Sequence, residues 1–116
     1  MVVGDRPVPD AFRAEVLRVG ESVLLAISGE LDVATTGCFR ASVEGLDDAD
    51  APAHVTADLS RLDFIDAAGV AALVSLRNAL DGVGGSLRLR SPKPPVRRVL
   101  ELAGVIDLFD AGSASP

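Results

Sequence analysis

The order of strand-like and helix-like segments is the feature of this sequence that most restricts its fold. Two strand-like segments, separated by the turn signal Gly20-Glu21, come first, and helix-like and strand-like segments then alternate along the chain. Consecutive parallel strands need a crossover connection between them, which is usually a helix. The alternation therefore predicts an α/β fold with a mixed, mostly parallel sheet and right-handed connections.

The strands are predicted from apolar runs and from alternation. Residues 22–28, SVLLAIS, are almost continuously apolar, which is typical of a central strand that is buried on both faces. Residues 14–19, 53–59 and 86–90 alternate apolar and polar side chains, as expected of further strands. Residues 106–109 form a short apolar segment that either packs on the core or pairs as a last strand.

Three helices are predicted from apolar spacing and from residues that begin or end helices. Residues 33–46 place apolar side chains at three- and four-residue spacing after Asp32, a good N-cap. A second helix follows Asp66 and stops at the glycines that begin with Gly82. A third covers residues 94–103, with two prolines at its start and a glycine after its end.

Size and composition exclude several classes of function. The chain has 116 residues, of which 48% are apolar, so one small domain with a real core is expected. We expect this domain over residues 11–110, between a flexible arm at 1–10 and a flexible tail at 111–116. The net charge of -6 argues against non-specific nucleic-acid binding, and only 3% of residues are aromatic, which argues against single-strand binding by stacking.

No metal, cofactor or enzymatic site is expected. The chain has one cysteine, Cys38, and one histidine, His54, too few for a structural zinc site or an internal disulfide. We expect Cys38 to be a small core residue and His54 to be structural or solvated. No nucleophile stands near a base, and no phosphate-binding loop has a strand before it and a helix after it, so an enzyme is not expected.

A cytoplasmic protein without membrane insertion is the default expectation. The first residues, MVVGDRPVPDAF, lack the basic region and apolar run of a signal peptide. No apolar segment reaches the roughly 20 residues that a membrane-spanning helix needs.

The turn before the second helix is arranged like a site but has no reactive side chains. Asp66 stands where the helix begins and is followed by Ala67, Ala68 and Gly69. Asp66 has a simple structural explanation as an N-cap, which contributes about 1 kcal/mol, and the alanines are good helix formers.

Five pieces in order along the chain resemble a STAS domain of the type found in bacterial anti-sigma factor antagonists. Each piece is a weak signal alone, but their order and spacing together are specific, and they cover nearly the whole chain. The pieces are GELD at 29–32, the helix after it, ADLSRLDFIDAAG at 57–69, SLRLRSP at 86–92 and VRRVLELAGVIDLF at 96–109.

The resemblance implies a fold and a function. It implies a sheet of four or five strands with about three to four helices. It also implies binding to an anti-sigma factor that is a serine kinase with a histidine-kinase-like ATPase fold, which releases a sigma factor. The kinase would phosphorylate a Ser or Thr directly after the loop Asp and so break the complex.

This sequence departs from the family pattern at the phosphorylated position. Ala67 stands where the family has the phosphoacceptor, and Ala68 where it usually has a second hydroxyl. The resemblance therefore predicts an antagonist without its phosphosite, either constitutively active or a decoy that occupies the kinase. The expected partner-binding residues are Asp32, Asp66, Ala67, Ala68, Gly69 and Val70.

Other interpretations stay open. The nearest hydroxyls in the sequence, which would be candidates for a displaced phosphosite, belong to Thr35, Thr36, Ser60 and Ser75. Self-association is also open. The alternative function is a scaffold or docking STAS subunit of a lipid-transport ABC complex or of a stress-signalling assembly.

Overall fold

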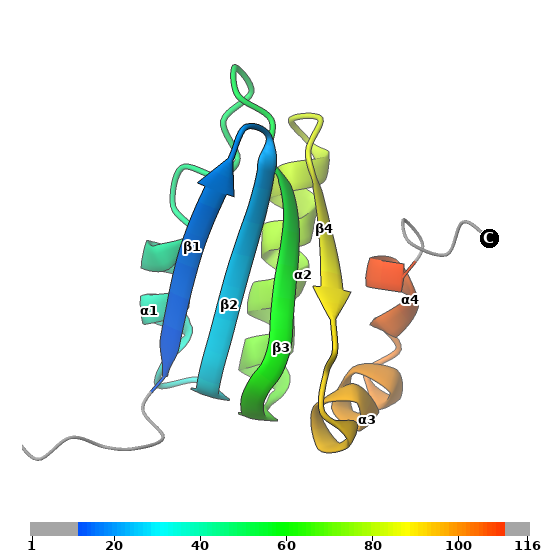
Figure 1. Cartoon of the computed structure of the whole chain (residues 1–116). Coiled ribbons are helices and arrows are strands. Elements are labelled where there is room, and N and C mark those ends of the chain that lie inside the picture. Colours follow the sequence, from blue (N-terminus) through cyan, green and yellow to red (C-terminus); the bar gives the residue numbers. More distant parts are fainter. Residues whose placement is uncertain (1–11, 111–116) are drawn as a thin grey trace, which may run out of the picture.

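The computed structural model describes residues 12–110 and contains one mixed sheet in the order β1-β2-β3-β4 (Figure 1). β1 pairs antiparallel with β2, whereas β2 with β3 and β3 with β4 are parallel. The predicted α/β fold with a mixed, mostly parallel sheet is confirmed. The elements are β1 Arg13–Val19, β2 Ser22–Leu31, α1 Thr36–Ser42, β3 His54–Ile65, α2 Ala67–Asp81, β4 Ser86–Arg90, α3 Pro94–Leu102 and α4 Ile106–Asp110.

The helices cover one face of the sheet and one of its edges. α1 and α2 lie behind the strands in Figure 1, α3 and α4 lie beyond β4, and the front face of the strands carries no helix. The side chains of β2 that point toward α1 and α2 are fully buried, including Val23, Leu25 and Ile27. This arrangement is a two-layer domain with its core between the sheet and the helices.

The prediction that β2 is buried on both faces is wrong. Its burial alternates, and Leu24 and Ala26, which point to the uncovered face, are only half-buried. A continuous apolar run suggests a strand that is covered on both faces. Here no helix covers the outer face, and the outer side chains of β2 are shielded only by the strands on each side. The sheet therefore has an open face with apolar residues in it.

The core contains only apolar side chains among the described residues. The fully buried stripe of α2 includes Leu73 and Leu80, as its spacing predicts, and Phe39 of α1 is also fully buried. The Phe12 ring packs edge-on against Phe39, with 6.4 Å between the ring centroids. No buried side-chain nitrogen or oxygen of the described residues lacks a hydrogen-bond partner. Burial of each large apolar side chain contributes about 1.5–3 kcal/mol to stability.

Two predicted elements differ in the structure. The helix predicted over residues 33–46 is only the seven-residue α1, because a hydrogen-bonded turn at Asp32 precedes it and the chain leaves the helix at Val43. Residues 106–109 form part of α4 and not a strand. Gly104, with φ of 76°, reverses the chain after α3, and Phe109 then packs into the core as helical side chains do.

Cys38 is exposed, which corrects its expected place in the core. It lies on α1, directly before the buried Phe39, so it is turned about 100° away from the buried stripe. The predicted flexible arm and tail lie outside the described residues. Within residues 12–110, no helix is long and apolar enough to cross a membrane.

Truncation of Leu73 tests the packing of α2. Leu73 is 0% exposed, so Leu73→Ala is expected to lower the free energy of unfolding by about 2–5 kcal/mol. Leu102→Ala is the matched control, because Leu102 is 76% exposed and its loss is expected to change stability by less than about 0.5 kcal/mol. Urea unfolding followed by circular dichroism measures both, and equal losses would contradict the described packing.

Candidate functional site

The turn between β3 and α2 is built around Asp66. Its backbone is extended, and its side-chain Oδ1 accepts a hydrogen bond from the Gly69 amide at 3.0 Å. Its carbonyl accepts from the Val70 amide at 2.9 Å, which begins the helical hydrogen-bond pattern. Asp66 is therefore the N-cap of α2, as predicted.

The parallel pairing of β2 and β3 brings a second turn beside this one. Leu31 and Ile65 are partners at the ends of the two strands, and the Asp66 amide donates a hydrogen bond to the Leu31 carbonyl at 3.2 Å. The next residue on β2 is Asp32, so two aspartates leave the same edge of the sheet from neighbouring strands. The structure thus places Asp32 and Asp66, two of the expected partner-binding residues, at the same edge of the sheet.

Gly69 allows the two turns to lie this close. A Cβ atom at this position would lie 2.4 Å from the Leu31 carbonyl oxygen and 2.7 Å from a side-chain carbon of Ile65. Carbon atoms do not approach a backbone oxygen so closely, so any side chain here forces α2 away from β2. In the sequence Asp66-Ala67-Ala68-Gly69, the first and last residues are therefore required by the structure, Asp66 as the N-cap and Gly69 by its close contact with Leu31.

The Asp32 turn is held by its own hydrogen bonds. Asp32 Oδ1 accepts from the amides of Ala34 at 3.0 Å and Thr35 at 3.1 Å. The Thr35 hydroxyl donates to the Glu30 carbonyl at 2.8 Å and accepts from the Asp32 amide at 2.9 Å. Asp32 caps this turn and not α1, whose N-cap is Thr35 without a side-chain cap bond.

The predicted site residues differ in exposure. Ala67 is exposed, and Asp32, Asp66 and Ala68 are half-buried, so all four contribute surface to the end of the sheet. The two other predicted residues, Gly69 and Val70, are buried and support the loop from below. A partner that binds at this end of the sheet would therefore contact Ala67 and the half-buried residues, and not Gly69 or Val70.

Two exposed apolar side chains at the same end were missed from the sequence. Phe64 is 47% exposed and lies beside Glu30 across the β2–β3 pair, and Val33 is 76% exposed directly after Asp32. A large exposed aromatic residue is typical of the centre of a protein interface. The sequence signal that could have identified Phe64 is its place between Leu62 and Ile65. Both of these residues point into the core, so Phe64 points outward.

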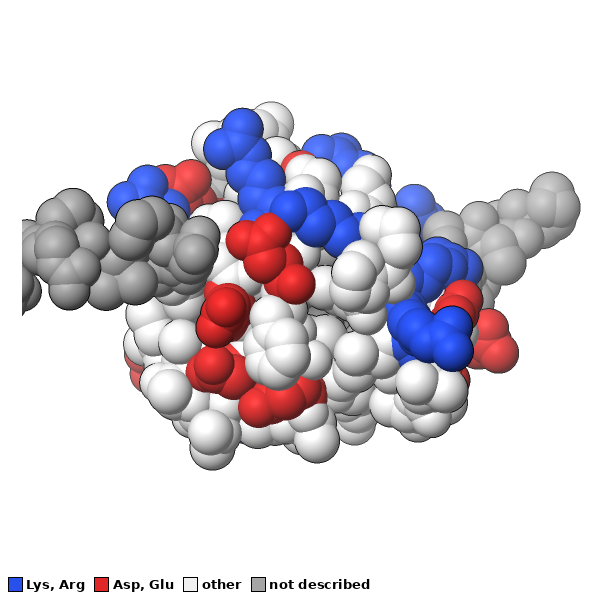
Figure 2. Space-filling view, turned by 90° about the horizontal axis from the view of Figure 1, so that it is seen from below, with Lys and Arg blue, Asp and Glu red and all other residues white. Residues whose placement is uncertain are grey.

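The surface at this end of the molecule carries mainly acidic side chains near its middle. Glu30, Asp32 and Asp66 all lie at the ends of β2 and β3 or at the start of α2. Figure 2, which views the molecule from this end, shows acidic side chains gathered near the middle and basic ones around part of the rim. Lys93, before α3, pairs with Asp63 near the end of β3. The surface suits a partner with basic and apolar side chains.

The hydroxyls considered as displaced phosphosites are spread over the fold. The Thr35 hydroxyl is engaged within the Asp32 turn, and the Thr36 hydroxyl contacts the Val33 carbonyl at 3.4 Å. Ser60 and Ser75 are exposed, Ser60 within β3 and Ser75 within the middle of α2. None of the four stands directly after Asp66.

The chain belongs to the STAS domain family. A family model described as STAS domain matches residues 13–115, which is most of the chain. An anti-sigma F factor antagonist of Paenibacillus polymyxa is 24% identical over 87 residues, or 75% of this chain and 74% of the relative.

Two solved structures support the same assignment. A structure of the anti-sigma factor antagonist SpoIIAA in its unphosphorylated form is 28% identical, with a TM-score of 0.63, over 79% of this chain and 83% of that one. A structure of the Bacillus cell fate determinant SpoIIAA in its phosphorylated form is also 28% identical, with a TM-score of 0.64, over 82% and 85%.

A side chain at Gly69 is expected to strain both turns. Gly69→Ala should lower the free energy of unfolding by about 1–3 kcal/mol, because its Cβ meets backbone that cannot rotate away. Gly37→Ala in α1 is the matched control. It meets nothing within 4 Å, so it should leave stability unchanged or raise it by up to about 1 kcal/mol. Thermal and urea unfolding of the two variants compare them, and an unaffected Gly69→Ala protein would refute the close approach.

Proposed function

We propose that this protein is an anti-sigma factor antagonist, which binds an anti-sigma factor and so releases a sigma factor. The observation that carries the proposal is the ordered turn Asp66–Gly69, with Ala67 exposed at its tip, in a domain that resembles named antagonists over most of its length. The domain acts by binding and not by catalysis, and it does so in the cytoplasm.

The partner is an anti-sigma factor of the serine-kinase type. A phosphate adds about -1.5 to -2 charges at pH 7. On residue 67 it would stand next to Asp66 and within an end of the molecule that already holds Asp32 and Glu30. A phosphate there would not fit against a partner shaped to the unmodified loop, and it would lose its hydration in the contact, so it would disrupt the complex.

Ala67 and Ala68 have no hydroxyl, so phosphorylation at this loop cannot separate the complex. The loop conformation depends on Asp66 and Gly69 and not on the side chains between them. The protein therefore keeps the shape of the contact surface without the modification that would weaken it. It acts as a constitutive antagonist, or as a decoy if the sigma factor is not released.

The contact surface combines Asp32, Asp66, Ala67 and Ala68 with the apolar side chains Val33 and Phe64. A few large side chains, aromatic ones among them, supply most of the affinity at protein interfaces, and the carboxylates orient a basic partner. Gly69 and Val70 contribute by holding the loop in place.

Recovery of the partner tests the proposed function and its surface together. Affinity purification of the tagged protein from its own cells, with mass spectrometry, is expected to recover a kinase-type anti-sigma factor. Phe64→Ser should lower the affinity for it at least about tenfold, since Phe64 is a large apolar side chain that is 47% exposed at this end of the sheet. Leu102→Ser is the matched control, because Leu102 is also an exposed apolar residue but lies on α3. Recovery of a transporter ATPase or a large assembly without an anti-sigma factor would instead support the scaffold function.

Substitutions at position 67 test the missing phosphosite. Ala67→Ser should accept phosphate from ATP with the purified partner kinase, whereas the natural protein should remain unmodified. Ala67→Glu should weaken the complex at least about tenfold, because a longer charged side chain does not fit a contact made by a methyl group and loses its hydration there. Asn78→Glu, which adds the same charge at an exposed position near the other end of α2, is the control and should bind normally. Phosphate on the natural chain, detected by mass spectrometry, would contradict the proposal.

A further inference from the structure

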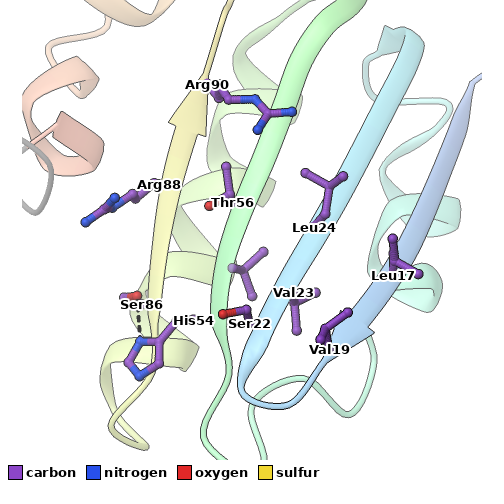
Figure 3. Close-up of a pocket in the computed structure, with 11 residues that line it drawn as sticks. Leu17, Val19, Ser22, Val23, Leu24, His54, Thr56, Ser86, Arg88 and Arg90 are labelled. Atoms are coloured by element: carbon purple, nitrogen blue, oxygen red, sulfur yellow. Dashed lines mark hydrogen bonds between the residues drawn. The ribbon is translucent and has the colours of Figure 1, made fainter.

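The open face of the sheet contains a groove at the end opposite the Asp66 turn. It has a volume of about 510 Å³, within the range of small-molecule sites, and residues from all four strands line it (Figure 3). The groove lies where β2, β3 and β4 begin, near Ser22, His54 and Ser86. We refer to it as the sheet groove.

One side of the sheet groove is apolar. Leu17 and Val19 of β1 are 62% and 71% exposed, and both point to the open face beside Leu24 of β2. Single exposed apolar side chains are common on protein surfaces. Two that share a groove with a half-buried leucine form a continuous apolar wall, which a hydrocarbon group would cover.

The other side of the sheet groove is polar and carries positive charge. The His54 Nδ1 and the Ser86 Oγ are hydrogen-bonded at 2.9 Å across β3 and β4, with Thr56 further along β3. Arg88 and Arg90 of β4 are the cationic lining residues. No carboxylate is among the lining residues, but Asp58 contacts Arg90, and Glu21 lies 3.9 Å from His54. This composition contrasts with a chain whose net charge is -6.

Arg90 is fixed in a position that faces the groove. Figure 3 shows its side chain extending across β3 toward Leu24. Its Nη2 atom is 3.2 Å from Oδ2 of Asp58, which also accepts a hydrogen bond from the Ser60 amide. The Ser60 bonds, and then Arg90, hold the pKa of Asp58 below its ordinary value, so the ion pair persists at neutral pH. A guanidinium has five N–H donors, so one carboxylate contact leaves donors for a second anion.

From these two sides, we propose that the sheet groove binds a small amphipathic carboxylate. Its hydrocarbon part covers Leu17, Val19 and Leu24, and its carboxylate accepts hydrogen bonds from Arg90 and from the polar groups near Thr56. Four neighbouring strands span about 14 Å, which sets the length of the ligand. A monocarboxylate with a medium-length alkyl chain fits this length, and its oxygens can accept hydrogen bonds from the Arg90 N–H donors that Asp58 does not use.

The sheet groove is independent of the proposed partner surface. β2 has ten residues, so its two ends lie about 30 Å apart, with the groove at one end and Asp32 after the other. Ligand binding can therefore be measured on the free protein, whether or not it binds an anti-sigma factor.

Titration of the full isotope-labelled chain with decanoate tests the proposal by NMR. Saturable shifts are expected at the amides of Leu24, Thr56 and Ser86, without shifts at Asp66 or Gly69. Decanol and decyltrimethylammonium are the probes for charge, and decanoate should bind at least about tenfold more tightly than either, because charge-assisted hydrogen bonds are the stronger kind.

Matched variants test whether the apolar side and the charged side of the groove each contribute to decanoate binding. Leu17→Ser and Arg90→Gln should each weaken decanoate binding about tenfold or more. Leu102→Ser and Arg98→Gln, which make the same changes on α3, should leave it unchanged. All four side chains are largely exposed, and unchanged melting temperatures would verify that each variant folds.

Three outcomes would overturn the proposal. The first is the absence of saturable shifts up to millimolar decanoate. The second is equal binding of decanol, which would remove the role of Arg90. The third is a dimer that Leu17→Ser dissociates, without ligand binding to either form, because a second copy would then be the occupant of the open face.

Discussion

The parallel pairing of β2 with β3 is the interaction on which the rest of the structure depends. It ends both strands at the same edge of the sheet, so that the Leu31 carbonyl can accept a hydrogen bond from the Asp66 amide. The turns that follow, at Asp32 and Asp66, then lie beside each other without direct bonds between their side chains. The same pairing begins both strands at the opposite edge, where the sheet groove lies.

Most of the fold and the shape of the central turn could be predicted from local sequence signals. Alternation of segments predicts the mostly parallel sheet, and the apolar stripe of α2 predicts its buried face. Asp66 follows the end of an apolar strand and precedes this stripe, a pattern that specifies an N-cap almost without reference to the rest of the chain. The resemblance to STAS domains then selects this turn as the proposed contact surface, which spacing alone does not.

The parts that could not be predicted depend on what covers a residue, and local patterns do not contain this information. The run SVLLAIS would suit a strand covered on two faces, yet one face of the sheet has no helix. For the same reason Phe64 resembles a core residue in the sequence but points outward, and Cys38 does not pack inward. Residues 106–109 are apolar in either conformation, and the chain reversal at Gly104 determines that they are helical.

The shape of the loop is set by the hydrogen bond from the Gly69 amide to the Asp66 side chain and by the close contact of Gly69 with Leu31. It does not depend on the identity of the two residues between Asp66 and Gly69. Alanine and serine codons can differ by a single base, and both residues fit the first turn of a helix. Under the proposed function, covalent control at this loop is therefore gained or lost in one mutational step while the fold stays the same. In that proposal, regulation by phosphorylation is a removable property of the domain, whereas Gly69 is required by its close contact with Leu31.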